Sequence, residues 1–96
     1  MRVDDLVKAK RSDIMRVAEL HGARSIRVFG SIARGTADDQ SDIDFLVEME
    51  PGRSLFDMGG LVMDLRDLFG RGVDVVTERG LKPRIRNRVI REAIPL

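Results

Sequence analysis

Apolar and polar residues recur along this chain with two different periods, and the change from one to the other predicts its secondary structure. In residues 3–21 the apolar positions are spaced by three and four, which predicts a single amphipathic helix with Gly22 as its stop. Residues 25–29 alternate polar and apolar side chains, which predicts a short strand. Residues 30–40 are rich in Gly, Asp and Thr, so we expect a turn or a short helix.

The second half of the chain repeats this change of period. Residues 42–48 are strand-like, with three apolar side chains on one side and mostly acidic ones on the other. Residues 55–69 should form a helix, with Ser54 as its N-cap and Asp57 as the partner in a weak capping box. Gly70 and Gly72 are expected to end this helix. Residues 73–77 are mostly apolar, which predicts a central strand.

A last helix is expected to begin at Pro83. The order is then helix, strand, turn, strand, helix, strand, helix. This order predicts an α+β or α/β sandwich-like fold, in which helices pack on a small mixed sheet of three or four strands. Since the chain has 96 residues, of which 43% are apolar, we expect one globular domain that spans residues 1–96.

Charge and cysteine content exclude some kinds of site. The 17 Lys and Arg residues balance the 16 Asp and Glu residues to a net charge of +1, which indicates no charged partner. The chain has no cysteine, which excludes disulfides and thiolate chemistry. The N-terminus has no apolar h-region and no run is long enough to span a bilayer, so we expect a cytoplasmic protein without a membrane segment.

Two acidic residues, Asp42 and Asp44, are candidates for a metal site. Residues two apart in a strand point to the same side, so their carboxylates lie roughly 7 Å apart along the backbone. The two charges repel each other unless a cation lies between them, and Mg²⁺ prefers such oxygen ligands. A solvated acidic strand face is the alternative interpretation of this pattern.

A Gly-Ser pair, Gly30-Ser31, comes directly after the first predicted strand. A glycine there lets the backbone approach a ligand closely, and the exposed amides of such a turn can bind an anion. The serine hydroxyl adds a further donor. The pair is therefore suited to the outer phosphates of a nucleotide whose metal the aspartates bind, although a plain turn also explains these two residues.

Asp74 is the third candidate, because it interrupts the apolar segment VDVV. A charge in such a segment is costly unless it is used or paired. If its strand lies beside that of Asp42 and Asp44, the three carboxylates can surround two metal ions and support in-line displacement at phosphorus.

The combined motif consists of GSIARGTADDQSDIDFLV, in which ten residues (32–41) separate Gly-Ser from Asp-x-Asp, and the later GVDVVT. It resembles the motif of the polymerase-beta-like nucleotidyltransferase superfamily, and of its minimal nucleotidyltransferases in particular. The resemblance covers nearly the whole chain, including the leading helix and the basic C-terminal helix. It implies the polymerase-beta-like nucleotidyltransferase fold.

The resemblance also implies roles for individual residues. Gly30 and Ser31 would bind the β- and γ-phosphates of ATP, and Asp42 and Asp44 would coordinate two Mg²⁺ ions. Asp74 would complete the shell of the catalytic ion and help to deprotonate the attacking hydroxyl. The ions would stabilise the charge that develops on the transferred group.

Arg34 lies within the matching string, and the resemblance allows it to reach phosphate. An ion pair with Asp38 or Asp39 explains Arg34 equally well. We interpret Asp38 and Asp39 as turn residues. Ser41 also lies in the matching string, and a structural cap explains it equally well.

Relatives that modify small molecules carry an additional acceptor-binding region. This chain ends at Leu96, soon after Asp74. Unless the acceptor binds at a dimer interface, we expect it to be supplied in trans, as a macromolecule or a partner chain. The resemblance implies an antitoxin that transfers AMP from ATP to a tyrosine of a HEPN-domain ribonuclease toxin, with which it forms a hetero-oligomer.

Two alternatives stay open: a non-catalytic antitoxin that occludes the toxin, and a nucleotidyltransferase whose acceptor is RNA or a small molecule. The three carboxylates favour the enzyme, because a purely steric binder does not need them. Nucleic-acid binding is less favoured, since the chain contains no Trp or Tyr.

Two further features allow a functional and a structural interpretation. The arginines Arg84, Arg88 and Arg91 of the last helix either dock an acidic partner or steer nucleotide, or they form a solvated helix face. His21, the single histidine, is expected to cap the first helix rather than to act in catalysis.

Overall fold

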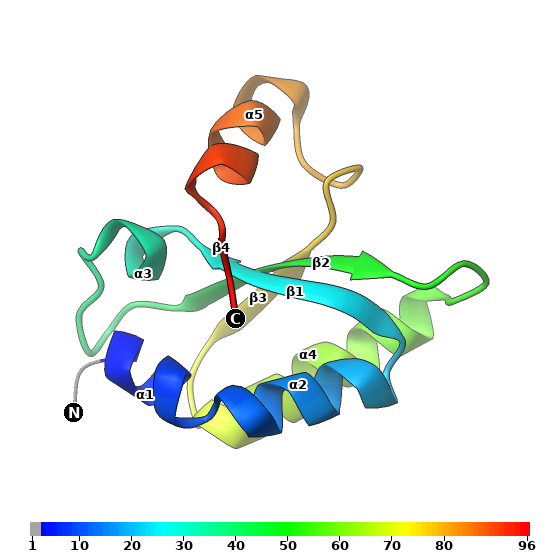
Figure 1. Cartoon of the computed structure of the whole chain (residues 1–96), viewed down its shortest axis with the longest axis horizontal. Coiled ribbons are helices and arrows are strands. Elements are labelled where there is room, and N and C mark those ends of the chain that lie inside the picture. The colour runs from blue at the N-terminus through cyan, green and yellow to red at the C-terminus, as the bar shows by residue number, and fades with distance from the viewer. Residues whose placement is uncertain (1–2) are drawn as a thin grey trace.

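A mixed four-stranded sheet forms the middle of the molecule in the computed structural model, which describes residues 3–96 (Figure 1). The strands have the order β3-β2-β1-β4; β2 pairs with β1 antiparallel and with β3 parallel, and β1 pairs with β4 antiparallel. The predicted α+β class is thus confirmed. The elements are α1 (Val3–Ala9), α2 (Arg11–Leu20), β1 (Ala23–Phe29), α3 (Ser31–Arg34), β2 (Ile43–Met49), α4 (Leu55–Phe69), β3 (Val73–Val76), α5 (Pro83–Glu92) and β4 (Ile94–Pro95).

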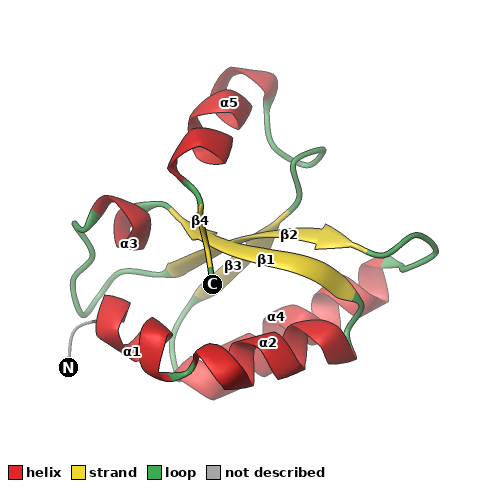
Figure 2. Ribbon diagram, viewed as in Figure 1, coloured by secondary structure: helices red, strands yellow, loops and turns green. Residues whose placement is uncertain are grey.

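Helices cover both faces of the sheet, but unequally (Figure 2). α1, α2 and α4 lie along one face, and α5 stands over the other. The strand alternation predicted for β2 sends Ile43, Phe45 and Val47 into the core under α2 and α4, where the Phe45 and Phe69 rings lie 6.3 Å apart. Leu46 points the other way, into a smaller cluster with Leu81 and Val89.

α4 has the ends that its sequence predicts. The Ser54 hydroxyl accepts a hydrogen bond from the Phe56 amide, and the Asp57 carboxylate accepts one from the Ser54 amide, which completes the capping box. Gly70 ends the helix in the left-handed conformation, with a φ of 63°. Within residues 3–96, no helix is both long and apolar enough to cross a membrane.

A glycine allows α4 to pack closely on the end of α2. A Cβ atom on Gly60 would lie 2.7 Å from Cε1 of His21, whereas one on Gly59 would meet nothing within 4 Å. His21 is the C-cap of α2, as predicted, and its Nε2 lies 2.6 Å from Oδ2 of Asp64 on α4. This residue therefore joins two helices in addition to ending one.

Three predictions about the elements were wrong or incomplete. The helix predicted for residues 3–21 is broken at Lys10, whose φ and ψ are −100° and 14°. β4 had no counterpart in the prediction. β3 is an edge strand rather than a central one; its sequence is apolar because Val73 packs under α4 while Val76 packs under α5.

Candidate active site

Two of the three predicted carboxylates come from neighbouring strands, and the third lies directly before one of them. In the parallel pairing of β2 with β3, Asp44 lies directly opposite Asp74. Phe45 follows Asp44 and Val75 follows Asp74, and both apolar side chains pack in the core on the side of α2 and α4. Since successive residues of a strand point to opposite faces, the two aspartates belong to the face that α5 covers. Asp42 lies one residue before β2, and its main chain neighbour Ile43 donates a hydrogen bond to the Gly72 carbonyl.

Gly30 lies against Asp44. Phe29 pairs with Asp44 across β1 and β2, so the next residue comes to lie over the carboxylate. A Cβ atom on Gly30 would come within 3.2 Å of Cγ of Asp44, and closer to its Oδ2. The φ of 72° and ψ of −146° also favour glycine. Both conditions explain why the Gly-Ser pair needs glycine first.

Gly72 lies against Asp42 as Gly30 lies against Asp44. A Cβ atom there would lie 2.8 Å from Cγ of Asp42. Arg71 also donates a hydrogen bond of 3.3 Å to the Ser41 carbonyl, which ties the segment before β3 to the segment before β2. The sequence interpretation took Gly72 only as part of the end of a helix and missed this contact.

Arg34 pairs with neither Asp38 nor Asp39, which corrects that interpretation of the turn. Its Nη1 lies 3.1 Å from Oε2 of Glu92, at the end of α5. The same Oε2 accepts a hydrogen bond of 2.7 Å from the Gly30 amide. Glu92 was missed by the sequence analysis, although it is the single acidic residue in the basic segment 79–96.

Asp38 and Ser41 have structural roles in the turn, which confirms the prediction for Asp38 and favours the cap for Ser41. The Asp38 amide donates to the Ser41 hydroxyl at 3.0 Å, and an Asp38 carboxylate oxygen accepts from the Gln40 amide at 2.8 Å. The Ser31 hydroxyl, in contrast, makes no hydrogen bond within residues 3–96 and stays available to a ligand.

Electrostatics set Asp44 apart from its neighbours. Burial raises the pKa of its carboxyl from the ordinary value of 3.8 to about 6, and the charges of Asp74, Asp42 and Glu92 act in the same direction, while Arg34 opposes them. Such crowding of negative charge is relieved when a cation binds. The donors are carboxylate oxygens, which is the ligand type of hard divalent cations such as Mg²⁺.

The protein alone does not form a closed cage for a metal ion. Among residues 3–96, no three His, Cys, Asp or Glu side chains converge closely enough to hold one. Asp42 and Asp74 are exposed, and Asp44 is half-buried. An ion at this edge of the sheet would therefore need oxygen ligands from a substrate in addition to the carboxylates, as is usual for Mg²⁺ in phosphate chemistry.

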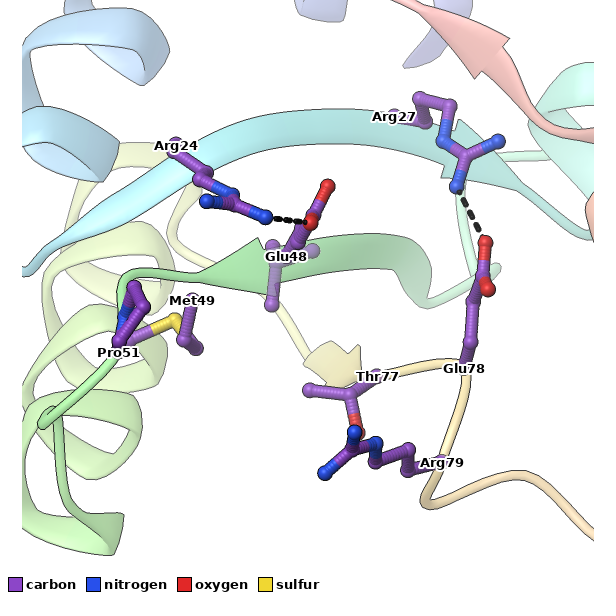
Figure 3. Close-up of a pocket in the computed structure, with 9 residues that line it drawn as sticks. Arg24, Arg27, Glu48, Met49, Pro51, Thr77, Glu78 and Arg79 are labelled. Atoms are coloured by element: carbon purple, nitrogen blue, oxygen red, sulfur yellow. Dashed lines mark hydrogen bonds and ion pairs between the residues drawn. The ribbon is translucent and has the colours of Figure 1, made fainter.

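A concavity lies away from the carboxylates and contains none of the predicted site residues (Figure 3). It measures about 560 Å³ and lies by the end of β2, whereas the carboxylates lie at its beginning. Four of its five charged side chains are paired with one another: Arg24 with Glu48, and Arg27 with Glu78 at 3.1 Å. This pairing leaves fewer charges for a ligand than the carboxylate cluster offers, so the cluster is the better candidate.

Comparison with known proteins identifies the family of the chain. Residues 14–96 match the family model of the nucleotidyltransferase domain. The protein adenylyltransferase MntA of Thermococcus cleftensis is 36% identical over 92 residues, which are 96% of this chain and 90% of the relative.

Solved structures support the same assignment. A candidate minimal nucleotidyltransferase is 48% identical, with a TM-score of 0.87 over 100% of this chain and 97% of the other. A toxin–antitoxin structure with AMP-PNP gives a TM-score of 0.73 over 88% of this chain and 69% of the other, at 22% identity, and so supports the fold alone. The chain therefore belongs to the nucleotidyltransferase domain family, and its fold is that of a minimal nucleotidyltransferase.

Proposed function

We propose that this nucleotidyltransferase is an antitoxin that transfers AMP from ATP to a tyrosine hydroxyl of a HEPN-domain ribonuclease toxin, and so inactivates it. One observation carries the proposal: Asp44 and Asp74 lie opposite each other on β2 and β3, and Gly30, directly after β1, lies against Asp44. The motif thus joins its phosphate-binding turn to its carboxylates in a single site. We further propose that residues 1–96 act as one domain in the cytoplasm.

Each predicted residue has a part in this proposal. The Gly30-Ser31 turn and Arg34 bind the β- and γ-phosphates of ATP, since Gly30 lies against Asp44 and the charge of Arg34 acts on the same carboxyl. Asp42 and Asp44 hold two Mg²⁺ ions, and Asp74 completes the ligand set of one of them. When bound, the ions supply positive charge to the α-phosphate and to the leaving pyrophosphate.

The reaction is an in-line displacement. The acceptor oxygen forms a bond to the α-phosphorus, while the bond from that phosphorus to the α–β bridging oxygen breaks and pyrophosphate leaves. Asp74, which is exposed, accepts the proton of the acceptor hydroxyl. The half-buried Asp44 must be ionised to bind an ion, so protons compete with Mg²⁺ for its carboxylate as the pH falls toward about 6, the pKa of that carboxyl without the metal.

The partner class rests on the relatives. The similar protein of Thermococcus cleftensis is named a protein adenylyltransferase, and the structural relative with AMP-PNP is a toxin–antitoxin complex. A protein acceptor also agrees with the exposed position of Asp74, where a side chain from another molecule can reach it. We propose a hetero-oligomer of the chain with its toxin.

The test is incubation of the protein with Mg²⁺, ATP and a HEPN protein encoded beside it. Intact mass spectrometry should show a toxin heavier by one or more adenylyl groups, and its ribonuclease activity should fall in parallel. Asp42→Asn should lower transfer by at least about a hundredfold, because removing a charge-stabilising group typically has that effect. Glu48→Gln, on the same strand but outside the site, is the control and should transfer normally.

The same assay separates the alternatives. Full neutralisation of the toxin by Asp42→Asn at native expression would support occlusion without catalysis. Label from ATP that appears in RNA or in a small molecule, and not in protein, would contradict the protein acceptor.

A further inference from the structure

The carboxylate of Glu92 reaches from the end of α5 to the turn that follows β1. Its Oε2 accepts a hydrogen bond of 2.7 Å from the Gly30 amide, and it lies 3.1 Å from Nη1 of Arg34. One side chain thus contacts the first residue of the turn and the last residue of α3. It does so across 62 positions of sequence.

The two partners of the ion pair differ in burial. The Glu92 side chain is 17% exposed, whereas that of Arg34 is 51% exposed. A largely buried carboxylate that is also bonded to a backbone amide has little freedom. Glu92 therefore orients the exposed arginine, and not the reverse.

Glu92 engages only some of the donors that this turn offers. A guanidinium has five N–H donors in a planar fork, and the bonds of Arg34 to Glu92 use Nη1 alone. Within residues 3–96, neither Nε nor Nη2 of Arg34 donates to another group. The Ser31 hydroxyl is also available, so an oriented arginine and a serine remain for an anion.

Stability alone gives a poor reason for this arrangement. The charge of Glu92 acts on the carboxyl of Asp44, and like charges that lie close together are unfavourable. An apolar residue at position 92 would avoid this repulsion. The contacts with Gly30 and Arg34 are what the carboxylate adds.

We propose that Glu92 is a positioning residue, which holds Arg34 and the Gly30-Ser31 turn in the arrangement that binds the phosphates of ATP. The inference rests on the proposed function, because it takes phosphate as the ligand of this turn. Glu92 touches no substrate in this role; it acts through the arginine and through the glycine amide.

The contacts of Glu92 with the Gly30 amide and with Arg34 have a competing explanation: its carboxylate occupies the place where a phosphate would bind. Glu92 would then have to leave before ATP enters. The two arrangements predict opposite effects for removal of the carboxylate. Binding of nucleotide becomes weaker if Glu92 positions the turn, and tighter if Glu92 occupies the place of a phosphate.

The experiment measures the dissociation constant of Mg²⁺·AMP-PNP by calorimetry, with the whole chain. Glu92→Ala should weaken binding about tenfold, which corresponds to about 1.4 kcal/mol. Glu92→Gln keeps an acceptor oxygen for the Gly30 amide, so it should restore most of the affinity. In an Arg34→Ala background, Glu92→Ala should have less than about a threefold effect, because coupled residues are not additive.

Glu78→Ala is the matched control. It removes another carboxylate that pairs with an arginine at 3.1 Å, on the same side of the sheet but outside the turn. This variant should bind Mg²⁺·AMP-PNP like the wild type. Thermal unfolding of all variants identifies any loss of affinity that comes from unfolding. If Glu92→Ala does not fold, Glu92→Gln still separates the two arrangements, because tighter binding is expected only if Glu92 occupies the place of a phosphate.

A second measurement needs no nucleotide. Hydrogen exchange of the Gly30 amide should be about tenfold faster in Glu92→Ala than in the wild type, and unchanged in Glu78→Ala. Unchanged exchange, unchanged affinity or tighter binding in Glu92→Ala would each overturn the inference while the proposed function stands. A wild-type protein that binds no Mg²⁺·AMP-PNP would overturn both.

Discussion

The carboxyl group of Asp44 should make the stability of the protein depend on pH. Its pKa is raised from 3.8 to about 6 in the folded chain, chiefly by burial. Between these values the folded state binds more protons than the unfolded state, so the free energy of unfolding decreases as the pH rises from about 4 to about 6. Above about pH 6 the free energy of unfolding no longer changes through this group.

Asp44→Asn removes this unfavourable charge. The variant should therefore unfold at a higher temperature than the wild type above pH 6, and the difference should disappear near pH 4. Thermal unfolding followed by circular dichroism from pH 4 to pH 8 measures both curves. A difference that is the same at every pH would refute this assignment.

Asp57 gives a control of opposite sign. Its hydrogen bond from the Ser54 amide lowers the pKa of its carboxyl, so the charged form stabilises the fold above the ordinary pKa and loses this effect as the pH falls. Asp57→Asn should accordingly lower the unfolding temperature near pH 7 and have little effect at low pH.

For single residues, the sequence predicted the strand face of Asp44, but not which side chains from distant parts of the chain lie beside the site. The two-residue period of a strand was enough to place Asp44 on the face opposite Phe45. No local pattern states which distant side chain meets a given turn, so the pairing of Arg34 with Glu92 needed the fold. The pattern also cannot show that Gly72 lies against Asp42, because that contact depends on the pairing of β2 with β3.

Among the elements, α4 offers a pair of adjacent glycines with different surroundings. Gly59→Ala should raise the free energy of unfolding by about 0.5–1 kcal/mol, because alanine favours a helix and its Cβ would meet nothing within 4 Å. Gly60→Ala should gain less or lose stability, because its Cβ would displace the His21 ring and disturb its contact with Asp64. Urea unfolding of both variants compares them directly.

The outcome that would contradict this packing is equal stabilisation by both substitutions. His21→Ala supplies the check, since removal of the ring should make Gly60→Ala as favourable as Gly59→Ala. A result of this kind would tie the glycine to the contact of α2 with α4.

Elements with strong local signals were predicted well, and those with weak signals were not. α4 has a capping box and a terminal glycine, and both formed as expected. β4 has two residues, which is too short for any period, and it exists because its residues pair with β1. The helix break at Lys10 has no Pro or Gly beside it, so the sequence contains no local signal for it. The placement of β3 depended on strand order, which hydrophobicity does not encode when helices cover both faces.

The molecule as a whole has almost no net charge, yet its charge is unevenly distributed. Arg84, Arg88 and Arg91 are exposed on α5, and none of them forms an ion pair with a carboxylate in residues 3–96. α5 stands over the sheet face that carries Asp44 and Asp74 (Figure 1). Unpaired basic residues on that side attract an anion before it makes contact.

These arginines should therefore accelerate the association of Mg²⁺·ATP with the site. Replacement of all three by alanine should lower the association rate several-fold at low ionic strength, and the difference should vanish near 1 M salt, where charges are screened within about 3 Å. Stopped-flow binding of a fluorescent ATP analogue measures the rate. Replacement of Lys8, Arg11 and Arg16 by alanine is the control, because it removes the same charge from α1 and α2 on the opposite face. Equal slowing in both triple variants would show that net charge alone matters, and unchanged rates in both would make α5 a solvated helix face.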